Sequence, residues 1–169
     1  MVIVGGGIAG LGAAHGLARA GVGRVRLLER ESVLCSHSSG RNAAIFLYLS
    51  SGAGDVELAR RSRALLSELL GSETSWLRKT GSWLVSATPQ PLEPLSRLAV
   101  REKLAFEQAK GTALESAVPA LIGGTIRRGL FFAEDGVIDI HAVSQGLARS
   151  AAAAGVVLSL GVEVARIEA

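Results

Sequence analysis

The chain has 169 residues, of which 49% are hydrophobic and 20% are charged, and its net charge is +3. This length and composition exclude a disordered chain and predict an ordinary globular fold with a sizeable core. The basic residues are scattered and only 4% of the residues are aromatic, which argues against nucleic acid as a partner.

The first thirty residues predict a β-α-β unit. Met1–Val4 has the apolar run of a buried strand, and Val25–Glu29 predicts a second strand. Ile8–Ala20, between them, is rich in alanine and leucine and predicts a helix that Gly21 ends. About thirty residues is the size expected of such a unit. A polar, serine-rich loop follows over residues 32–40.

The middle of the chain predicts helices that alternate with extended segments. Asp55 is expected to cap a helix that ends near Leu70. Residues 76–87 are expected to be extended around a turn at Thr80-Gly81. Three prolines then interrupt the chain: Pro89, Pro91 and Pro94.

The last third of the chain predicts two helices, a hairpin and two closing strands. A charged helix is expected over Leu95–Lys110, with Gly111 as its stop. Asp135-Gly136 lies between two apolar runs and predicts a hairpin turn. Asp139 is expected to cap a helix that continues through Ala154. The two closing strands are expected at Val156–Leu160 and Val162–Ile167.

The segment Gly5-Gly6-Gly7-Ile8-Ala9-Gly10 fits the dinucleotide-binding pattern G-x-G-x-x-G, with a predicted strand before it and a predicted helix after it. Gly5 permits the tight turn, Gly7 leaves room for a pyrophosphate, and Gly10 lets the helix pack closely on the strand. The helix N-terminus, at Ile8 and Ala9, offers free N–H groups and a partial positive charge to the phosphates.

Glu29 lies at the end of the second predicted strand, 19 residues after Gly10. A carboxylate at this place can accept hydrogen bonds from a ribose hydroxyl, and it would repel a 2′-phosphate. The alternative is a glycine-rich turn without a ligand, with Glu29 as a solvated surface charge. The order of strand, glycines, helix and carboxylate favours the dinucleotide site.

These residues resemble the N-terminus of a known family. VIVGGGIAGLGAAHGLARAG and VRLLERE are similar to the opening of the FAD-dependent amine and amino-acid oxidoreductases, which include D-amino-acid oxidase, glycine oxidase and sarcosine oxidase. A basic residue typically follows the strand-end glutamate in its flavin-binding members, and Glu29-Arg30 matches that pair. The resemblance implies FAD as the cofactor.

Two further stretches extend the resemblance. HSSGRNAAIF, residues 37–46, resembles the loop that passes over the FAD pyrophosphate and the flavin ring. Residues 134–168 resemble the family's second cofactor-binding segment, in which the backbone of a strand valine contacts adenine, and Val164 is the matching position. The loop residues that the resemblance places at the cofactor are Ser38, Ser39, Arg41, Asn42 and Ala43. Solvated side chains are the alternative for the two serines. Arg41 could face the flavin, the pyrophosphate, an anionic substrate or solvent.

The sequence also departs from the family. Some dehydrogenase relatives attach FAD covalently through a loop histidine, and Asn42 occupies that position here, so we expect noncovalent FAD. The family continues well beyond residue 169 and draws much of its flavin and substrate site from the later part. We therefore expect the chain to be the front part of a longer enzyme, with the missing C-terminal half as its partner. No catalytic residue and no metal ligand is assigned.

The expected fold class is α/β, with a Rossmann-like FAD-binding domain that begins with the βαβ unit. Part of an antiparallel α+β substrate domain interrupts it, and the fold looks truncated at the C-terminus. We expect residues 1–50 and 134–169 to form the two segments of the FAD-binding domain. Residues 51–133 are expected to form the partial substrate domain.

The activity implied by the resemblance is oxidation of the C–N bond of a small-molecule amine or amino acid, with hydride transfer to flavin N5. One alternative is a relative that oxidises a hydroxy acid or glycerol phosphate. Another is a truncated nucleotide-binding remnant without catalysis. The single cysteine, Cys35, excludes an intrachain disulfide and a cysteine-cluster metal site, and it fits a cytoplasmic setting. No apolar stretch reaches the roughly 18 residues of a membrane span.

Overall fold

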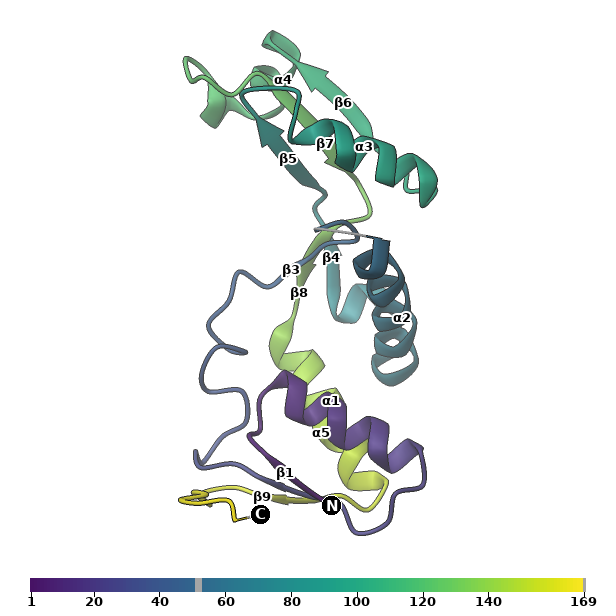
Figure 1. Ribbon diagram of the computed structural model, residues 1–169, viewed down its shortest axis with the longest axis vertical. Coiled ribbons are helices and arrows are strands. Elements are labelled where there is room, and N and C mark those ends of the chain that lie inside the picture. The colour runs from purple at the N-terminus through teal and green to yellow at the C-terminus, as the bar shows by residue number, and fades with distance from the viewer. Residues whose placement is uncertain (51–52, 169) are drawn as a thin grey trace. The chain divides into compact units, whose positions relative to one another are not determined.

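The computed structural model describes residues 1–50 and 53–168. The chain divides into two compact units, whose helices and strands are labelled in Figure 1. The first unit comprises Met1–Ala44, Leu65–Trp76 and Ile138–Ala169, and the second comprises Ile45–Ala64 and Leu77–Val137. This mixed architecture of a parallel sheet with helices and of antiparallel sheets confirms the predicted fold class. Among the described helices, none combines the length and apolar character that a membrane crossing requires.

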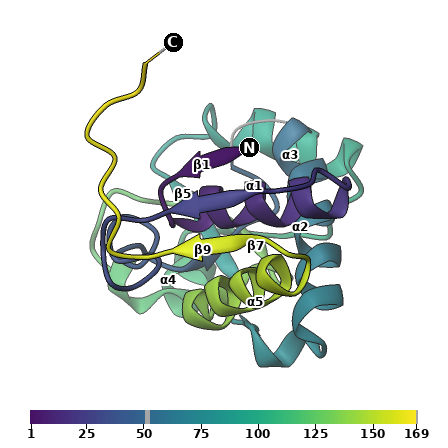
Figure 2. The ribbon, with the colours of Figure 1, turned by 90° about the horizontal axis from the view of Figure 1, so that it is seen from below.

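The first unit contains a parallel sheet in the order β1-β2-β9. Its strands are β1 (Val2–Val4), β2 (Arg26–Leu28) and β9 (Val157–Ser159). Helices α1 (Ile8–Arg19) and α5 (Ile140–Ala153) lie side by side against one face of this sheet (Figure 2). The sequence-predicted β-α-β unit is therefore confirmed, with β9 added as a third strand on the far side of β2.

The two faces of this sheet differ in exposure because neighbouring side chains on a strand point to opposite sides. Leu27 faces the helices and is fully buried, as are Leu11 and Ala14 of α1. On the other face Val2 is 60% exposed and Val4 is 55% exposed, and their register partners on β2 are Arg26 and Leu28. The sheet therefore has one face, with Val2, Val4 and Arg26, that the described residues leave largely exposed.

The second unit contains an antiparallel sheet in the order β5-β7-β6. A further sheet has the order β3-β8-β4. The strands are β3 (Ile45–Phe46), β4 (Leu77–Lys79), β5 (Ser82–Ser86), β6 (Glu107–Lys110), β7 (Arg128–Phe132) and β8 (Gly136–Ile138). The remaining helices of the chain are α2 (Ala53–Leu70), α3 (Leu92–Arg101) and α4 (Thr112–Ala117), with short 3-10 turns η1 (Glu73–Ser75) and η2 (Pro119–Leu121). Residues 65–70 of α2 and the turn η1 belong to the first unit.

One apolar cluster forms the core of the second unit. Helix α3 packs on β5 and β7, and Phe106 stacks on Phe132 with ring centroids 5.8 Å apart. The buried members of the cluster are Leu49, Val56, Leu92, Ala99, Leu130 and Phe132. Burial of this apolar surface is the main stabilising contribution to the unit.

The predicted helix over Leu95–Lys110 is wrong at both ends. Helix α3 begins at Leu92, so that Pro94 lies in its first turn, where a missing N–H costs nothing. The helix ends before Lys103, which has a φ of +55°. Phe106 then enters the core, and the following residues pair with β7 as strand β6.

The hairpin predicted at Asp135-Gly136 is also wrong. Strand β7 pairs with β5 and β6, whereas β8 lies in the other sheet between β3 and β4. Asp135 is only 1% exposed, and its carboxylate accepts hydrogen bonds from Tyr48 N at 3.0 Å and Ser82 Oγ at 2.5 Å. These bonds hold the chain in a crossing between two sheets instead of a turn back.

Of three further predictions, a helix cap and a closing strand are wrong, and a second helix cap is confirmed. Asp55 does not cap α2, because the helix already includes Ala53 and Asp55 lies in its first turn. Val162–Ile167 forms no strand in the described part of the chain. At the start of this segment, Val162 N donates a hydrogen bond to Glu29 O at 2.8 Å. Asp139 caps α5 as predicted, accepting from Ala142 N at 2.9 Å.

Replacing Asp135 should destabilise the second unit. In Asp135→Ala the Tyr48 N–H and the Ser82 hydroxyl lose their acceptor, which costs about 2 kcal/mol in the free energy of unfolding. Burial raises the pKa of Asp135 above its ordinary 3.8, against the opposing hydrogen bonds of Ser82 and Tyr48. Its contribution to stability is therefore fully present below about pH 3.8 and is lost as the pH rises through the folded-state pKa.

Urea unfolding at several pH values checks this expectation. The difference between the wild-type protein and Asp135→Asn isolates this group, because asparagine keeps the shape without the titration. The wild-type protein should lose stability relative to Asp135→Asn as the pH rises above 3.8. A difference that stays constant with pH would contradict a buried, titrating Asp135.

Candidate cofactor site

The site begins at the glycine turn between β1 and α1. Gly5 has a φ of +104°, a backbone conformation that favours glycine. A Cβ added to Gly10 would lie 2.0 Å from the carbonyl oxygen of Gly5. The close approach of helix α1 to the turn at Gly5 therefore requires that residue 10 has no side chain.

The N-terminus of α1 presents backbone N–H groups at this turn. Its N-cap, Gly7, provides no side-chain hydrogen bond, and its first turn contains no acidic residue. Ile8 N donates to Ser39 Oγ at 3.0 Å, which places Ser39 of the serine-rich loop at the helix end. Within residues 1–50 and 53–168, the N–H groups of Ala9 and Gly10 have no acceptor. Such an end attracts an anion.

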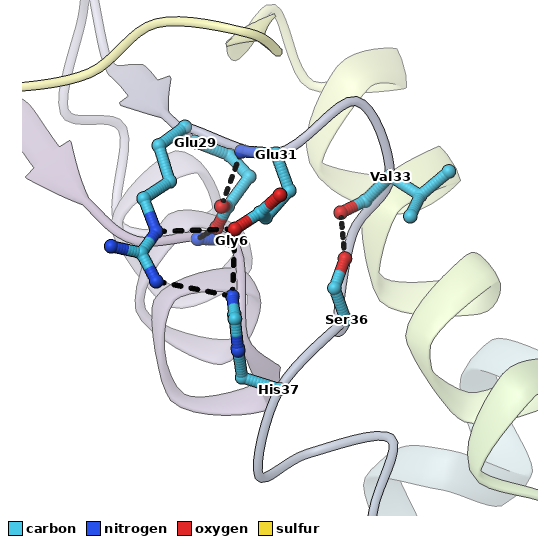
Figure 3. A network of polar contacts seen from close by, with 7 residues as sticks. Gly6, Glu29, Glu31, Val33, Ser36 and His37 are labelled. Carbon is cyan, nitrogen blue, oxygen red and sulfur yellow. Dashed lines mark hydrogen bonds and ion pairs between the residues drawn. The ribbon is translucent and has the colours of Figure 1, made fainter.

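Glu29 lies directly after β2 and is only 9% exposed. Its Oε1 accepts from Glu31 N at 2.9 Å, and its Oε2 accepts from Gly6 N at 2.5 Å (Figure 3). The Glu31 N–H, then the Gly6 N–H and the charge of His37, hold the pKa of Glu29 below its ordinary 4.5, against the opposing effect of burial. Glu29 is therefore a carboxylate at neutral pH, anchored to the glycine turn.

A second polar group lies beside Glu29. Nε2 of His37 lies 2.8 Å from Glu31 Oε1 and 3.3 Å from Arg30 Nη2, and Arg30 Nε lies 3.2 Å from the same Glu31 oxygen (Figure 3). The hydrogen bond from His37 is the main cause that lowers the pKa of Glu31. This group ties the serine-rich loop to the segment that follows β2.

A cleft of about 310 Å³ opens beside these residues, where β1 and β2 end. Ligands of open α/β sheets bind at the carboxyl ends of the strands, so the cleft has the expected place for a dinucleotide. Four of the predicted cofactor residues line it, namely Gly5, Glu29, Arg30 and Val164. The other lining residues are Val4, Leu28, His37, Val162 and Glu163.

The remaining predicted loop residues lie outside this cleft. Ser38, Arg41, Asn42 and Ala43 are exposed. Asn42 makes a local turn, with Nδ2 donating to Ser39 O at 2.5 Å and Oδ1 accepting from Ala44 N at 2.6 Å. The side chain of Arg41 makes no hydrogen bond or ion pair in the part of the chain that the structure describes. The roles of these residues at the cofactor stay predictions.

Two residues at this site were missed in the sequence. Gly6 is buried, and an added Cβ would lie 2.6 Å from Leu34 Cδ2 and 3.0 Å from Glu29 Cβ. Its place inside the glycine motif was the available signal. The sequence pattern does not reveal its role, because G-x-G-x-x-G assigns none to the second residue. His37 lines the cleft although it belongs to a loop of weak sequence pattern, and only the fold brings it to Glu29.

Glu29→Ala is expected to weaken FAD binding by roughly 1–3 kcal/mol, the range for leaving a buried hydrogen-bonding group unpaired. The Gly6 and Glu31 N–H groups would also lose their acceptor. Flavin fluorescence titration of the full-length protein measures the affinity. Glu163→Gln is the matched control, because Glu163 lines the same cleft but is exposed. Unchanged affinity in Glu29→Ala would remove Glu29 from the site.

Comparison with known proteins shows the family of the chain. The family model described as FAD dependent oxidoreductase (DAO) matches residues 1–169. Mitochondrial sarcosine dehydrogenase of Mus musculus is 28% identical over 162 residues, which are 92% of this chain and 17% of that protein. The chain therefore spans only a small part of this curated relative.

Solved structures show the same fold. Glycine oxidase from Bacillus cereus ATCC 14579 superposes with a TM-score of 0.70 and 24% identity, covering 99% of this chain and 48% of that one. L-alpha-glycerophosphate oxidase from Mycoplasma pneumoniae, solved with FAD bound, gives a TM-score of 0.73 and 18% identity over 97% of this chain and 45% of that one. The chain belongs to the DAO family of FAD-dependent oxidoreductases.

Proposed function

We propose that the protein to which this chain belongs oxidises the C–N bond of an amino acid or amine with FAD as the hydride acceptor. The observation that carries the proposal is the cleft at the ends of β1 and β2, which Gly5 and the buried Glu29 line, and the glycine turn that leads from it into α1. The relatives named sarcosine dehydrogenase and glycine oxidase support an amino-acid or amine substrate.

The residues present fit the adenosine and phosphate part of FAD. The free N–H groups of Ala9 and Gly10 would hold the pyrophosphate, together with the hydroxyls of Ser38 and Ser39. Glu29, whose pKa is lowered, is ionised at neutral pH and would accept hydrogen bonds from ribose hydroxyls. The half-buried Val164 lines the cleft and would contact adenine.

The flavin end of the cofactor depends on the exposed loop. Bound FAD supplies the hydride acceptor at N5, so the redox chemistry belongs to the cofactor and the protein provides position and charge. Asn42 cannot form the covalent link of a histidine, and we propose noncovalent FAD. Release of FAD from the denatured protein tests this point, because a covalent flavin would stay with the polypeptide.

A hydroxy acid or glycerol phosphate is the second candidate substrate class, and the similarity to glycerophosphate oxidase supports it. Anaerobic flavin bleaching of the full-length protein distinguishes the two. Sarcosine, glycine and other amino acids should reduce the flavin, whereas lactate and glycerol 3-phosphate should not. Reduction by the second group alone would overturn the proposal of C–N oxidation.

We also propose a cytoplasmic setting, which rests on the single cysteine.

The 169-residue polypeptide expressed alone should retain little FAD, self-associate and oxidise no amine. The exposed side of the β1-β2-β9 sheet, with Val2, Val4 and Val157, favours self-association. Flavin content, size-exclusion chromatography and turnover assays measure the three properties. A monomer with stoichiometric flavin and clear turnover would show that these residues suffice for activity.

A further inference from the structure

The second unit carries a cleft that the proposed oxidation does not use. It lies between α3 and the neighbouring strands β6 and β7 and has a volume of about 290 Å³. None of its lining residues lines the cofactor cleft, and all of them belong to the second unit. The lining includes Lys110 and Arg128 on the strands and Glu93 and Ser96 on the helix.

Two cations face each other directly on the strand side of this cleft. Lys110 and Arg128 are register partners in the antiparallel pair of β6 and β7. Residues in this position lie on the same face of a sheet with their Cβ atoms about 5 Å apart, and like charges there are destabilising. Lys110 is exposed, whereas Arg128 is half-buried on the central strand of its sheet.

Neither cation has an anionic partner in the described parts of the chain, residues 1–50 and 53–168. Elsewhere in the same unit neighbouring cations share a carboxylate: Arg63 and Lys79 lie 3.0 and 2.9 Å from the same oxygen of Glu134. The adjacent Arg127 likewise pairs with Glu115. The pair Lys110 and Arg128 is therefore a concentration of positive charge with no carboxylate at ion-pair distance among the described residues; Glu93, on the helix side of the cleft, pairs with Arg97 at 3.9 Å.

We propose that this cleft binds a small organic anion through its carboxylate or phosphate group. The forked guanidinium of Arg128 matches either oxyanion, and Lys110 adds a second charge. The apolar side chains of Pro89 and Leu92 line the same cleft and suit a short aliphatic part of the ligand. Its volume lies at the low end for ligand sites, which limits the occupant to a small molecule.

Isothermal titration of the full-length, FAD-loaded protein tests this site with two probes, sodium butyrate and sodium phosphate, at matched ionic strength. Loading with FAD keeps the probes from the N-terminus of α1. We expect saturable binding of at least one probe, and the tighter one identifies the carboxylate or the phosphate as the preferred group. Arg128→Gln and Lys110→Gln should each weaken it about tenfold or more.

Arg101→Gln is the matched control, because Arg101 is an exposed cation of α3 that does not line the cleft. It should leave the affinity unchanged. Lys110 is exposed and lies on β6, which pairs with one strand only, β7, among the described residues. The Lys110→Gln variant should therefore fold even if Arg128→Gln does not. Absence of saturable binding, or equal affinity in Lys110→Gln and Arg101→Gln, would overturn the proposal.

Discussion

The Gly10→Ala variant is expected to lose FAD binding and to become less stable by about 3 kcal/mol. The new Cβ would lie 2.0 Å from the carbonyl oxygen of Gly5 and 3.5 Å from a methyl group of Ile3. Because the clashing atom is backbone, no side-chain rotation relieves it. Helix α1 would have to move away from β1, and the N–H groups of its first turn would shift relative to the glycine turn.

Gly12→Ala provides the control for this prediction. Gly12 lies inside the same helix, and an added Cβ there meets nothing within 4 Å. Alanine is a better helix former than glycine by roughly 0.5–1 kcal/mol, so this variant should be slightly more stable and should bind FAD normally. Urea unfolding and flavin titration of both full-length variants make the comparison. Equal stability and affinity in the two would show that Gly10 is not required for close packing.

The sequence predicts the β-α-β unit well because the residues that determine it are close together in the sequence. The apolar run before Gly5, the helix after Gly7 and the strand before Glu29 all follow from neighbouring residues, and the structure has them as β1, α1 and β2. Asp139 also acts locally, since its side chain reaches the N–H of a residue three positions later. Such patterns need no knowledge of the remaining chain.

The predictions that are wrong depend on partners distant in the sequence. Residues 107–110 have a helical composition, but they pair with residues of β7 that lie 18 to 24 positions later and become β6. Asp135-Gly136 has the residues of a hairpin turn, but the buried carboxylate bonds to Tyr48 and Ser82. In both places a tertiary interaction overrides the local preference, which a single sequence does not contain.

The same distinction applies within the cofactor site. Glu29 is found from its distance to the glycines, because the β-α-β unit fixes that spacing. The contact of Glu31 with His37 arises only when the serine-rich loop folds back to the end of β2. Loop conformation of this kind has no periodic signal, so His37 could not be predicted to line the cleft.

Gly7→Val should abolish FAD binding and leave the fold intact, unlike Gly10→Ala. A Cβ at Gly7 meets only Ser39 Oγ, at 3.0 Å, and this hydroxyl lies at the end of a side chain that can rotate. The protein should therefore keep its stability within about 1 kcal/mol. The valine methyl groups would occupy the space beside the N-terminus of α1 that the pyrophosphate needs.

We expect the FAD affinity of Gly7→Val to fall by at least roughly a hundredfold, which is about 2.8 kcal/mol. Gly7→Ala should show a smaller loss, because a single methyl group contacts Ser39 without filling the phosphate position. Flavin titration with a parallel measurement of thermal unfolding separates a blocked site from a misfolded one. A yellow, fully loaded Gly7→Val protein would mean that the dinucleotide binds elsewhere. A valine variant that lost its fold would show that this glycine serves packing, as Gly10 does, and not access of the phosphates to the helix.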